Sequence, residues 1–408
     1  MKIKILFFVL AIVLVENFGI LYAQEGPVRM MAPPPGESKI ITPSGIATFP
    51  FELVSNHIVI PVEINGTVVK LILDTGMPME GLILSGGQST EKLNLPIMGK
   101  APIVGGADGN TVMTDLSMEV DFKLPGVEFS DQMVLVMPNN PMKGVDGVIG
   151  NSVFKHFVTS INYDAMEITL TEPDKFSYTG KGEKIPLEIG AHLTTTGKVG
   201  MKNGEMVPMN LTVDTGFQGV LGLNASQDDS DILPEKCIEA FGAGAGGKFS
   251  VKVGRTEGFR IGSFHFSNVL SSFSQKLRNP NKNGGVLGQE ILKRFNVIFD
   301  YARKSMILEP NAKFDEPFEF GEGNMAGFQP TKTEDGRMEI SHIYPDSPAA
   351  EAGLKTGDIL SSIDGRPVGG LTSNEITAFL GQDGKAVTLG IIRNGESLSK
   401  RIVLRRLI

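Results

Sequence analysis

An internal repeat limits what this chain can fold into more than any other feature of its sequence. Leu71–Gly76 and Leu211–Gly216 each run from a short apolar stretch into the tripeptide Asp-Thr-Gly. Farther along, residues 148–163 and 286–301 align without a gap and share Val, Gly, Lys, Phe and Tyr at matching positions. A repeat of this kind indicates two copies of one structural unit, so we expect two halves built on the same plan.

Each Asp-Thr-Gly follows a hairpin signal. An Asn-Gly pair at 65–66 and another at 203–204 stand between apolar strand patterns, and this dipeptide favours a two-residue β-hairpin turn. The second strand of each hairpin leads into the Asp, and a short helix with a strand pair follows later. Both halves are therefore expected to be all-β apart from that helix. The expected strands are residues 58–64, 67–71, 158–163 and 166–170 in the first half, and 197–201, 207–213, 297–301 and 305–308 in the second.

Glycine-rich segments lie at residues 104–109 and 241–247, after each Asp-Thr-Gly. Runs of glycine cost backbone entropy, so they suit mobile hairpin tips better than core strands. A phosphate-binding loop is disfavoured, because no Lys-Ser or Lys-Thr follows either run and no helix pattern opens there.

The N-terminus has the pattern of a secretory signal. A basic start with Lys2 and Lys4, an apolar core at 5–15 and a small-residue cleavage site ending at Ala23 predict a signal peptide at residues 1–23. An uncleaved membrane anchor is the alternative, although the apolar run is short for a bilayer span. The pattern predicts an exported protein, periplasmic or secreted, of bacterial type.

Residues 24–47 contain a Pro-Pro-Pro run at 33–35 and show little periodicity. This composition predicts a disordered linker. A regulatory propeptide is the alternative interpretation.

Composition and charge narrow the possible partners. A length of 408 residues allows two or three domains, and a net charge of -8 with no basic block before the last residues argues against nucleic acid. Cys237 is the only cysteine, so it cannot form an intramolecular disulfide and is expected to be a buried small side chain. The five His show no ligand-like spacing, so we expect no metal and no cofactor.

The two Asp-Thr-Gly loops, each with a later hydrophobic-hydrophobic-Gly, resemble those of retroviral-type aspartic proteases. They are similar to the bacterial branch in which two such halves sit in one chain. The resemblance implies a mostly β fold, with retropepsin-like lobes at 48–178 and 183–311 in a pseudo-twofold arrangement. The duplication suggests a built-in pseudo-dimer, which leaves the oligomeric state open and is compatible with a monomer.

The site residues follow from this resemblance. Two carboxylates brought within hydrogen-bonding distance cannot both ionise, so Asp74 and Asp214 would share a proton and activate water against a peptide carbonyl. The glycine-rich hairpins would close over an extended polypeptide as flaps. The residues expected to support the site are Thr75, Gly76, Thr215, Gly216, Gly150 and Gly288, and the expected flap residues are Gly105, Gly106, Gly244 and Gly246.

This sequence departs from the family pattern directly after each tripeptide, where Met77 and Phe217 replace the usual Ala or Ser. Neither side chain can donate a hydrogen bond, so we expect the acid limb of activity to lie higher than in pepsin. The same bulk could obstruct the site, which keeps a non-catalytic interpretation open.

The C-terminal part carries a different series: Ser-Pro-Ala at 347–349, Gly-Asp at 357–358 and Ile-Asp-Gly at 363–365. The series resembles a bacterial PDZ domain, an α+β fold expected at residues 323–408, with a helix capped by Thr372 and Glu375. The resemblance implies that Ala326, Gly327 and Phe328 would hold the C-terminal carboxylate of a peptide that adds as a strand. Use for internal contacts or self-assembly is the alternative.

Three functions are compatible with these patterns. The first is an exported aspartic endopeptidase in which the PDZ domain captures substrate or regulates access. The second is a non-catalytic peptide-binding protein on the same fold, and the third is a hydrolase of another amide polymer.

Overall fold

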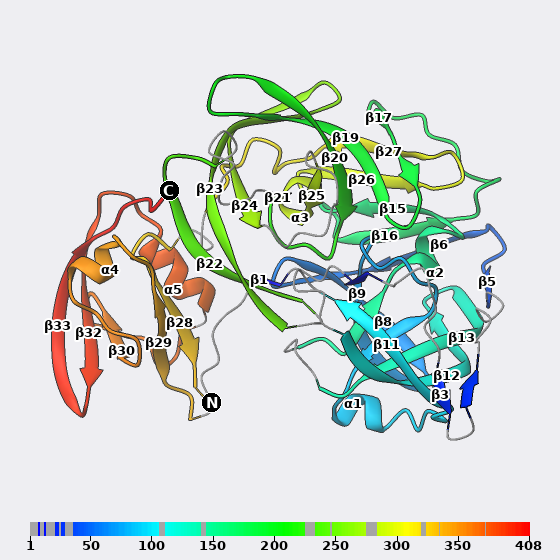
Figure 1. Cartoon of the computed structure of the whole chain (residues 1–408), viewed down its shortest axis with the longest axis horizontal. Helices are drawn as coiled ribbons and strands as arrows, with labels where there is room; N and C mark the ends of the chain where they lie inside the picture. The colour runs from blue at the N-terminus through cyan, green and yellow to red at the C-terminus, as the bar shows by residue number, and fades with distance from the viewer. Residues whose placement is uncertain are drawn as a thin grey trace.

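The computed structural model describes residues 36–408 with internal gaps, together with short N-terminal strands whose side chains are not described. The gaps are residues 106–110, 140–143, 225–232, 245–246, 275–283, 320–323, 334 and 372. The N-terminal strands are β1 (Phe7–Phe8), β2 (Ile12–Val13), β3 (Leu21–Ala23) and β4 (Gly26–Val28). Figure 1 shows two β lobes beside each other and a smaller unit packed against the second lobe.

Lobe 1 is almost entirely β-structure, because its Asn-Gly turn and alternating apolar residues favour hairpins over helices. Its longest hairpin among the described residues, β12–β13, belongs to the same sheet as β9, the strand before Asp74. The elements are β5 (Glu37–Ile40), β6 (Ile46–Pro50), β7 (Glu52–Val54), β8 (His57–Ile64), β9 (Thr67–Leu73), β10 (Leu82–Ser85), α1 (Gln88–Glu91), β11 (Gly99–Gly105), β12 (Thr111–Leu124), β13 (Val127–Met137), β14 (Gly147–Ile149), α2 (Asn151–Phe154), β15 (Val158–Asn162) and β16 (Glu167–Thr171).

Lobe 2 repeats the plan of lobe 1. Its elements are β17 (Glu183–Pro186), β18 (Glu188–Ile189), β19 (Leu193–Gly200), β20 (Met206–Asp214), β21 (Leu221–Asn224), β22 (Cys237–Gly244), β23 (Gly247–Ile261), β24 (Phe264–Ser274), β25 (Gly284–Gly288), α3 (Gln289–Leu292), β26 (Phe295–Asp300) and β27 (Ser305–Pro310).

The strand order of the two lobes is the same. Lobe 1 runs β11-β12-β13-β10-β14-β9-β8, and lobe 2 runs β22-β23-β24-β21-β25-β20-β19. The strand before each Asp pairs in parallel with the strand before the downstream glycine, β9 with β14 and β20 with β25. The repeat in the sequence is therefore a repeat in the fold, and both Asp residues lie at equivalent positions.

A shared sheet joins the two halves beneath the lobes. Its order is β17-β27-β26-β15-β16-β6, and β15 pairs antiparallel with β26 at its centre. Phe154 and Phe299 meet edge-on across this junction with ring centroids 5.4 Å apart, and both are fully buried in a core that runs through both lobes. The shared sheet and continuous core fix the lobes relative to each other.

The expectation of a disordered linker through residue 47 is wrong for residues 37–47. Strand β5 pairs with β13, and β6 pairs with β16 at the edge of the shared sheet. Ala47 and Phe49 are buried there, at 3% and 2% exposure. The apolar residues of β5 and β6 have the register that these sheets require, but the sheet partners are distant in the sequence, so local patterns do not predict the pairing. Lobe 1 therefore begins near residue 37 rather than 48.

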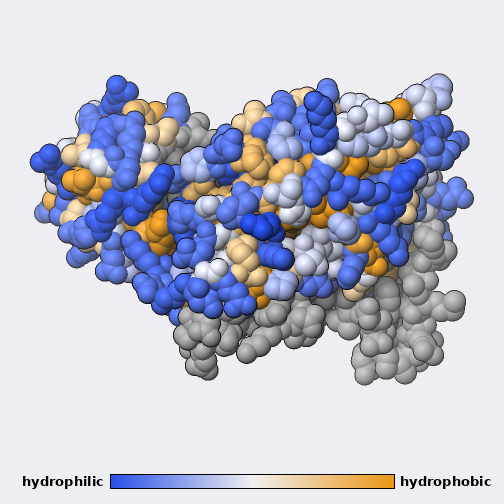
Figure 2. All heavy atoms as spheres, turned by 90° about the horizontal axis from the view of Figure 1, so that it is seen from above, coloured by the Kyte–Doolittle hydropathy of each residue, from blue (hydrophilic) through white to orange (hydrophobic). Residues whose placement is uncertain are grey.

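The C-terminal unit has its own apolar core and sheet, in the order β28-β29-β30-β32-β33. No helix in the described part of the chain is long and apolar enough to cross a membrane. The face of the molecule in Figure 2 is mainly hydrophilic, with apolar residues in separate patches. The elements of the unit are β28 (Phe328–Lys332), β29 (Met338–Ile343), α4 (Pro348–Glu351), β30 (Ile359–Ile363), β31 (Arg366–Pro367), α5 (Ser373–Leu380), β32 (Ala386–Arg393) and β33 (Glu396–Val403).

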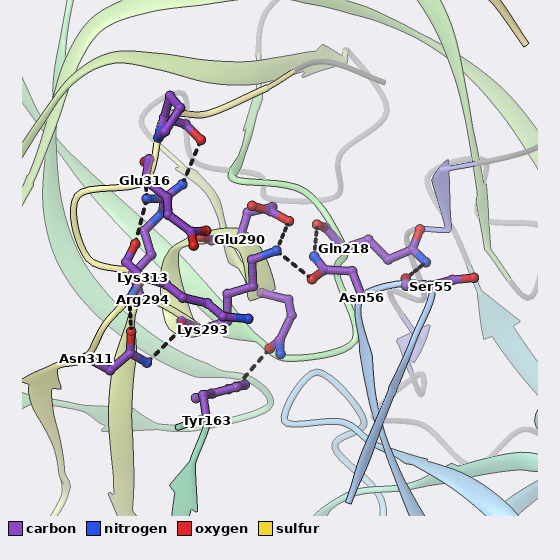
Figure 3. A network of polar contacts seen from close by, with 12 residues as sticks. Ser55, Asn56, Tyr163, Gln218, Glu290, Lys293, Arg294, Asn311, Lys313 and Glu316 are labelled. Carbon is purple, nitrogen blue, oxygen red and sulfur yellow. Dashed lines mark hydrogen bonds and ion pairs between the residues drawn. The ribbon is translucent and has the colours of Figure 1, made fainter. Parts of the chain in front are cut away.

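Arg294 organises the connector between lobe 2 and the C-terminal unit. It is 1% exposed, and its guanidinium lies 4.0 Å from the centre of the Phe318 ring. The guanidinium donates hydrogen bonds to the carbonyls of Glu290, Lys313, Phe314, Glu316 and Pro317. Figure 3 shows some of these hydrogen bonds. A buried guanidinium is tolerated because backbone carbonyls satisfy its donors, and in turn it fixes the path of residues 313–318.

Candidate active site

Asp74 and Asp214 face one another between the lobes. Asp74 directly follows β9, Asp214 ends β20, and their exposures are 0% and 2%. The two carboxyl groups are within hydrogen-bonding distance of each other. The structure therefore brings the two sequence-predicted acids into one buried pair.

The threonines lock the two loops together. Thr75 Oγ1 donates to the Val213 carbonyl at 2.7 Å and accepts from the Thr215 N–H at 3.0 Å. Thr215 Oγ1 does the same in reverse, donating to the Leu73 carbonyl at 2.8 Å and accepting from the Thr75 N–H at 3.0 Å. These reciprocal buried bonds fix the separation of the two Asp residues, because moving one loop would leave polar groups of both unpaired.

Glycine follows each threonine because the opposite carboxylate leaves no room for a side chain. A Cβ added to Gly76 would lie 2.6 Å from Asp214 Cγ, and one added to Gly216 would lie 2.5 Å from Asp74 Cγ. Heavy atoms cannot approach so closely without displacing the loops. The Asp-Thr-Gly motif is thus required by packing across the pair as well as by the turn itself.

The downstream glycines support the loops from below. A Cβ at Gly150 would lie 2.7 Å from the Asp74 carbonyl oxygen, and one at Gly288 would lie 2.6 Å from Phe217 Cδ1. Met77 and Phe217 themselves are 0% and 3% exposed. Met77 belongs to an apolar cluster of lobe 1, and Phe217 to one that lobe 2 shares with the C-terminal unit. Both bulky side chains are accommodated in these buried clusters.

The two carboxylates differ in their hydrogen bonds. Asp214 Oδ1 accepts from the N–H groups of Gly216 at 2.8 Å and Phe217 at 2.9 Å. Asp74 Oδ1 accepts from the Gly76 N–H at 2.6 Å. The N–H groups of Met77 and Phe217 each donate to the main-chain carbonyl of their own Asp at 3.3 Å, and that of Phe217 is shared with the carboxylate. Donors to an ionised carboxylate stabilise it, so Asp214 is the better site for the negative charge.

Burial raises the pKa of both acids. Burial, and then the neighbouring Asp214 charge, hold the pKa of Asp74 well above its usual range, and burial raises the pKa of Asp214 to about 6. Asp74 Oδ2 is buried and has no donor from the described residues. A proton held by Asp74 and shared with Asp214 satisfies this oxygen, so the pair is arranged to keep one proton.

The sequence-predicted flap residues fall partly outside the described residues. Gly106 and Gly246 are not described, while Gly105 ends β11 and Gly244 ends β22. The described strands β11–β12 and β22–β23 pair as antiparallel hairpins up to these ends. Their closing over the site stays a prediction.

The expected carboxylate-binding loop of the C-terminal unit is largely committed to internal bonds. The Ala326 N–H donates to Asn324 Oδ1 at 3.0 Å, and Asn324 Nδ2 donates back to the Phe328 carbonyl at 2.9 Å. Ala326 and Phe328 are 0% and 2% exposed, and Pro330 removes one backbone donor from the edge strand β28. Of the N–H groups expected to hold a carboxylate, that of Ala326 is therefore already paired.

Sequence patterns did not single out His57, which lies beside the Asp-Thr-Gly loop of lobe 2. It is 4% exposed, and its Nε2 is 3.1 Å from the Gly216 carbonyl oxygen. A single histidine at the start of a strand carries no motif. The signal lies in the hairpin register: continuing the β8–β9 pairing places His57 across from Asp74, and the β19–β20 pairing places His192 across from Asp214.

Comparisons with known families place two domains in the chain. Residues 60–153 match the aspartyl protease family, and residues 339–393 match the PDZ domain. The first match contains Asp74 and Gly150 but ends before Asp214. The chain therefore contains an aspartyl protease domain within lobe 1 and a C-terminal PDZ domain within a mostly β fold.

Similarity to individual proteins is confined to short segments. A 66-residue segment is 39% identical to the magnetosome formation protease MamE of Paramagnetospirillum magneticum, covering 16% of this chain and 9% of that protein. In Escherichia coli (strain K12), the periplasmic serine endoprotease DegP is 30% identical over 67 residues, and the periplasmic pH-dependent serine endoprotease DegQ is 34% identical over 65. Each match covers 16% of this chain and 14% of those proteins. The chain thus spans only a small part of each relative.

Proposed function

We propose that this protein is an exported aspartic endopeptidase that uses both halves of its repeat. The observation that carries the proposal is the buried Asp74–Asp214 pair, held by reciprocal threonine bonds between lobes of identical strand order. The aspartyl protease match to lobe 1 supports it, as do the protease names of the relatives. The names of DegP and DegQ say serine endoprotease, but each similar segment covers only 16% of this chain and 14% of that protein, so these names do not assign a mechanism here.

The two carboxylates accept different numbers of N–H hydrogen bonds, and this difference assigns the base and the acid of the reaction. Asp214, ionised and held by two N–H groups, takes a proton from water while the water oxygen attacks the peptide carbonyl carbon. Asp74 donates its proton to the carbonyl oxygen, which gives a neutral gem-diol. Asp214 then passes its proton to the amide nitrogen, the C–N bond breaks, and one gem-diol hydroxyl returns its proton to Asp74.

The raised pKa values predict activity at higher pH than in an enzyme with a strongly acidic dyad. Catalysis requires one proton on the pair, so kcat should fall as the pH drops through the pKa of Asp214, about 6, and stay high above it until Asp74 ionises. Initial rates on a fluorogenic peptide between pH 2 and pH 9 measure this. Full activity near pH 2 would show that the dyad is far less shielded than its burial indicates.

The substrate is an extended polypeptide with apolar side chains beside the cleaved bond. Apolar clusters lie behind both catalytic loops, with Ile103 and Leu116 in lobe 1 and Phe249 and Val251 in lobe 2. An extended chain can add backbone hydrogen bonds to strand edges, as peptides do in other β-rich sites. The basic and apolar N-terminus and the periplasmic names of two relatives favour an exported bacterial location.

Inhibition by a statine-containing peptide tests the proposal directly. Such a peptide presents a hydroxyl where the gem-diol forms, so it should block cleavage of denatured casein by the full chain. A fluorophosphonate that labels catalytic serines should leave the rate unchanged and serves as the matched reagent control. Binding of the statine peptide without any cleavage at any pH favours the peptide-binding alternative. Cleavage of non-peptide amides alone favours the third function.

The PDZ domain is proposed to regulate the protease through lobe 2. Tyr344 and Leu407, each 7% exposed, share one buried apolar cluster with Phe217, Phe249 and Val251. Tyr344 also donates its N–H to the Gly327 carbonyl, in the loop where a carboxylate would bind. A rearrangement of that loop would therefore be transmitted through Tyr344 to the β22–β23 hairpin and to Phe217, by direct contacts.

Tyr344→Ala should loosen the β22–β23 hairpin. Removing a buried aromatic ring leaves a cavity and costs about 3–5 kcal/mol locally, so amide hydrogen exchange in β22 and β23 should speed up and casein cleavage should slow. Ile392→Ala, at a 37% exposed position on β32, is the control and should change neither. Unchanged exchange in the hairpin of the Tyr344 variant would contradict this coupling.

A further inference from the structure

His57 connects lobe 1 to the catalytic loop of lobe 2. It begins β8, is 4% exposed, and its Nε2 is 3.1 Å from the carbonyl oxygen of Gly216. Gly216 is the residue whose N–H donates to Asp214 Oδ1. The Gly216 carbonyl shares its peptide unit with the Phe217 N–H, which also donates to Asp214 Oδ1. The imidazole therefore bonds directly to a peptide unit that holds the carboxylate.

The partners of the imidazole define its tautomer. A carbonyl oxygen can only accept, so Nε2 must carry a proton and donate to Gly216. The other nitrogen, Nδ1, lies 3.3 Å from Gln218 Nε2, and an amide nitrogen can only donate. The ring is therefore neutral, with its proton on Nε2. Burial lowers the pKa of His57 to about 4, an effect that the Gly216 and Val54 carbonyls partly offset.

Further bonds tie the same loop to lobe 1. Gln218 Nε2 also donates to the Ser55 carbonyl, and Asn56 Nδ2 donates to the Gln218 carbonyl at 2.8 Å. Lys293 of lobe 2 donates to Asn56 Oδ1 at 3.0 Å and pairs with Glu290. Figure 3 shows these side chains converging from the two lobes. Lobe 1 thus holds the Gly216–Gln218 segment by its first and last carbonyls, those of Gly216 and Gln218.

The clamp is asymmetric although the fold is a repeat. His192, which the hairpin register makes the counterpart of His57, is only half-buried. The asymmetry matches that of the acids, because Asp214 receives two backbone N–H bonds and Asp74 Oδ1 receives one.

We propose that His57 is a positioning residue that holds the Gly216–Gln218 segment so that its N–H groups stay aimed at Asp214, which makes Asp214 the base of the pair. The inference rests on the proposed aspartic peptidase function. His57 is 4% exposed and acts only through the backbone of the opposite lobe. Its neutral form is required, because a second proton on Nδ1 would face the Gln218 amide N–H.

The charged groups nearest this clamp do not position the Gly216–Gln218 segment in place of His57. Lys293 and Glu290, on and beside α3, neutralise each other as an ion pair. Asp214 and Asp74 act on His57 only through the loop backbone. The Val54 carbonyl is the acceptor available to a protonated Nδ1, which could then no longer accept from the Gln218 amide.

The test compares His57→Gln, His57→Leu and His192→Gln in the full chain. The side-chain amide of Gln can place an N–H at the position of His57 Nε2 and donate to the Gly216 carbonyl. His57→Gln should therefore keep kcat near that of the wild type. His57→Leu should lower kcat by about 10- to 100-fold, the effect of misplacing a catalytic group, with KM little changed. His192→Gln is the matched control on the other lobe and should leave kcat unchanged. Equal kcat for His57→Leu and the wild type would overturn the proposal.

The pH profile gives a readout that a purely structural role would not change. Wild-type log kcat should fall with a slope of one below the Asp214 pKa of about 6 and more steeply below the His57 pKa of about 4. In His57→Gln the steeper limb should disappear. A steeper limb that persists in this variant contradicts the assignment.

Nitrogen-15 NMR of the imidazole decides the tautomer without any assay of cleavage. The spectrum should show a protonated Nε2 and an unprotonated Nδ1 at pH 7, and the reverse tautomer would refute the clamp. Should the wild type cleave nothing, the proposed function fails while this spectrum still reports on the clamp. If His57→Leu does not fold, Gln218→Ala removes other bonds of the same clamp, those of the half-buried Gln218 side chain to His57 Nδ1 and to the Ser55 carbonyl. It should lower kcat in the same direction, and an unchanged kcat there would overturn the proposal.

Discussion

Asp74→Asn and Asp214→Asn are each expected to abolish peptide cleavage while the chain stays folded. An amide has nearly the shape of a carboxyl group but can neither take a proton from water nor return one to the leaving nitrogen. General acid–base catalysis contributes about 10²- to 10⁴-fold, so kcat should fall at least that far in either variant. Rates on a fluorogenic peptide measure the loss, and circular dichroism checks the fold.

The same variants should be more stable than the wild type at pH 8. A carboxyl group whose pKa is raised on folding contributes stability below the unfolded value of 3.8, and this is lost as the pH rises through about 6 in the case of Asp214. That shift corresponds to about 3 kcal/mol, and Asn does not incur the loss because it has no proton to release. Thermal unfolding at pH 4 and pH 8 measures the difference.

Asp121→Asn is the control for both effects, because Asp121 is exposed on β12. It should keep its activity and show no gain in stability at pH 8. Cleavage at the wild-type rate by either dyad variant would remove Asp74 and Asp214 from the mechanism.

Gly216→Ala is expected to eliminate most of the activity through a single methyl group. The added Cβ would lie 2.5 Å from Asp74 Cγ, so the two loops must separate and the threonine bonds must stretch. Misplacing a catalytic group by about 1 Å can cost about 10²-fold, and overpacking a tight site costs about 1–3 kcal/mol of stability. Gly76→Ala should behave similarly, with a Cβ 2.6 Å from Asp214 Cγ.

Gly99→Ala provides the matched control. No heavy atom lies within 4 Å of a Cβ at Gly99, which is in β11 of lobe 1. This variant should match the wild type in kcat and melting temperature. An active Gly216→Ala enzyme would mean that the two carboxylates are not in contact during catalysis.

Much of the β-framework could be predicted from the sequence because its signals are local. The Asn-Gly pairs at 65–66 and 203–204 form the turns between β8 and β9 and near β19 and β20. The aligned segments at 148–163 and 286–301 fold in the same way, each with a helix of one turn between two strands. Residues 37–47 were assigned to the linker because their pairing partners lie about a hundred residues away.

Of the candidate site, only the central Asp-Thr-Gly motif of each half could be predicted from the sequence. Asp, Thr and Gly recur in each half because the turn and the crowded loop interface require those residue types, and this requirement is visible in the sequence. The bond from His57 to Gly216 joins residues 159 positions apart, and no local pattern announces it. The same holds for Arg294, which could be read only as one position in an aligned repeat.

The sequence by itself determined the doubled β-framework, the placing of one acid at the end of a strand in each half, and a distinct C-terminal unit. Hairpin propensity and repetition act between near neighbours along the chain, so they can be read without coordinates. Only the tertiary structure decided which carboxylate is better supplied with N–H donors, how deeply the pair is buried, and how Tyr344 of the PDZ domain meets the β22–β23 hairpin. These depend on desolvation and on contacts between segments far apart in the chain, which arise only when the lobes pack.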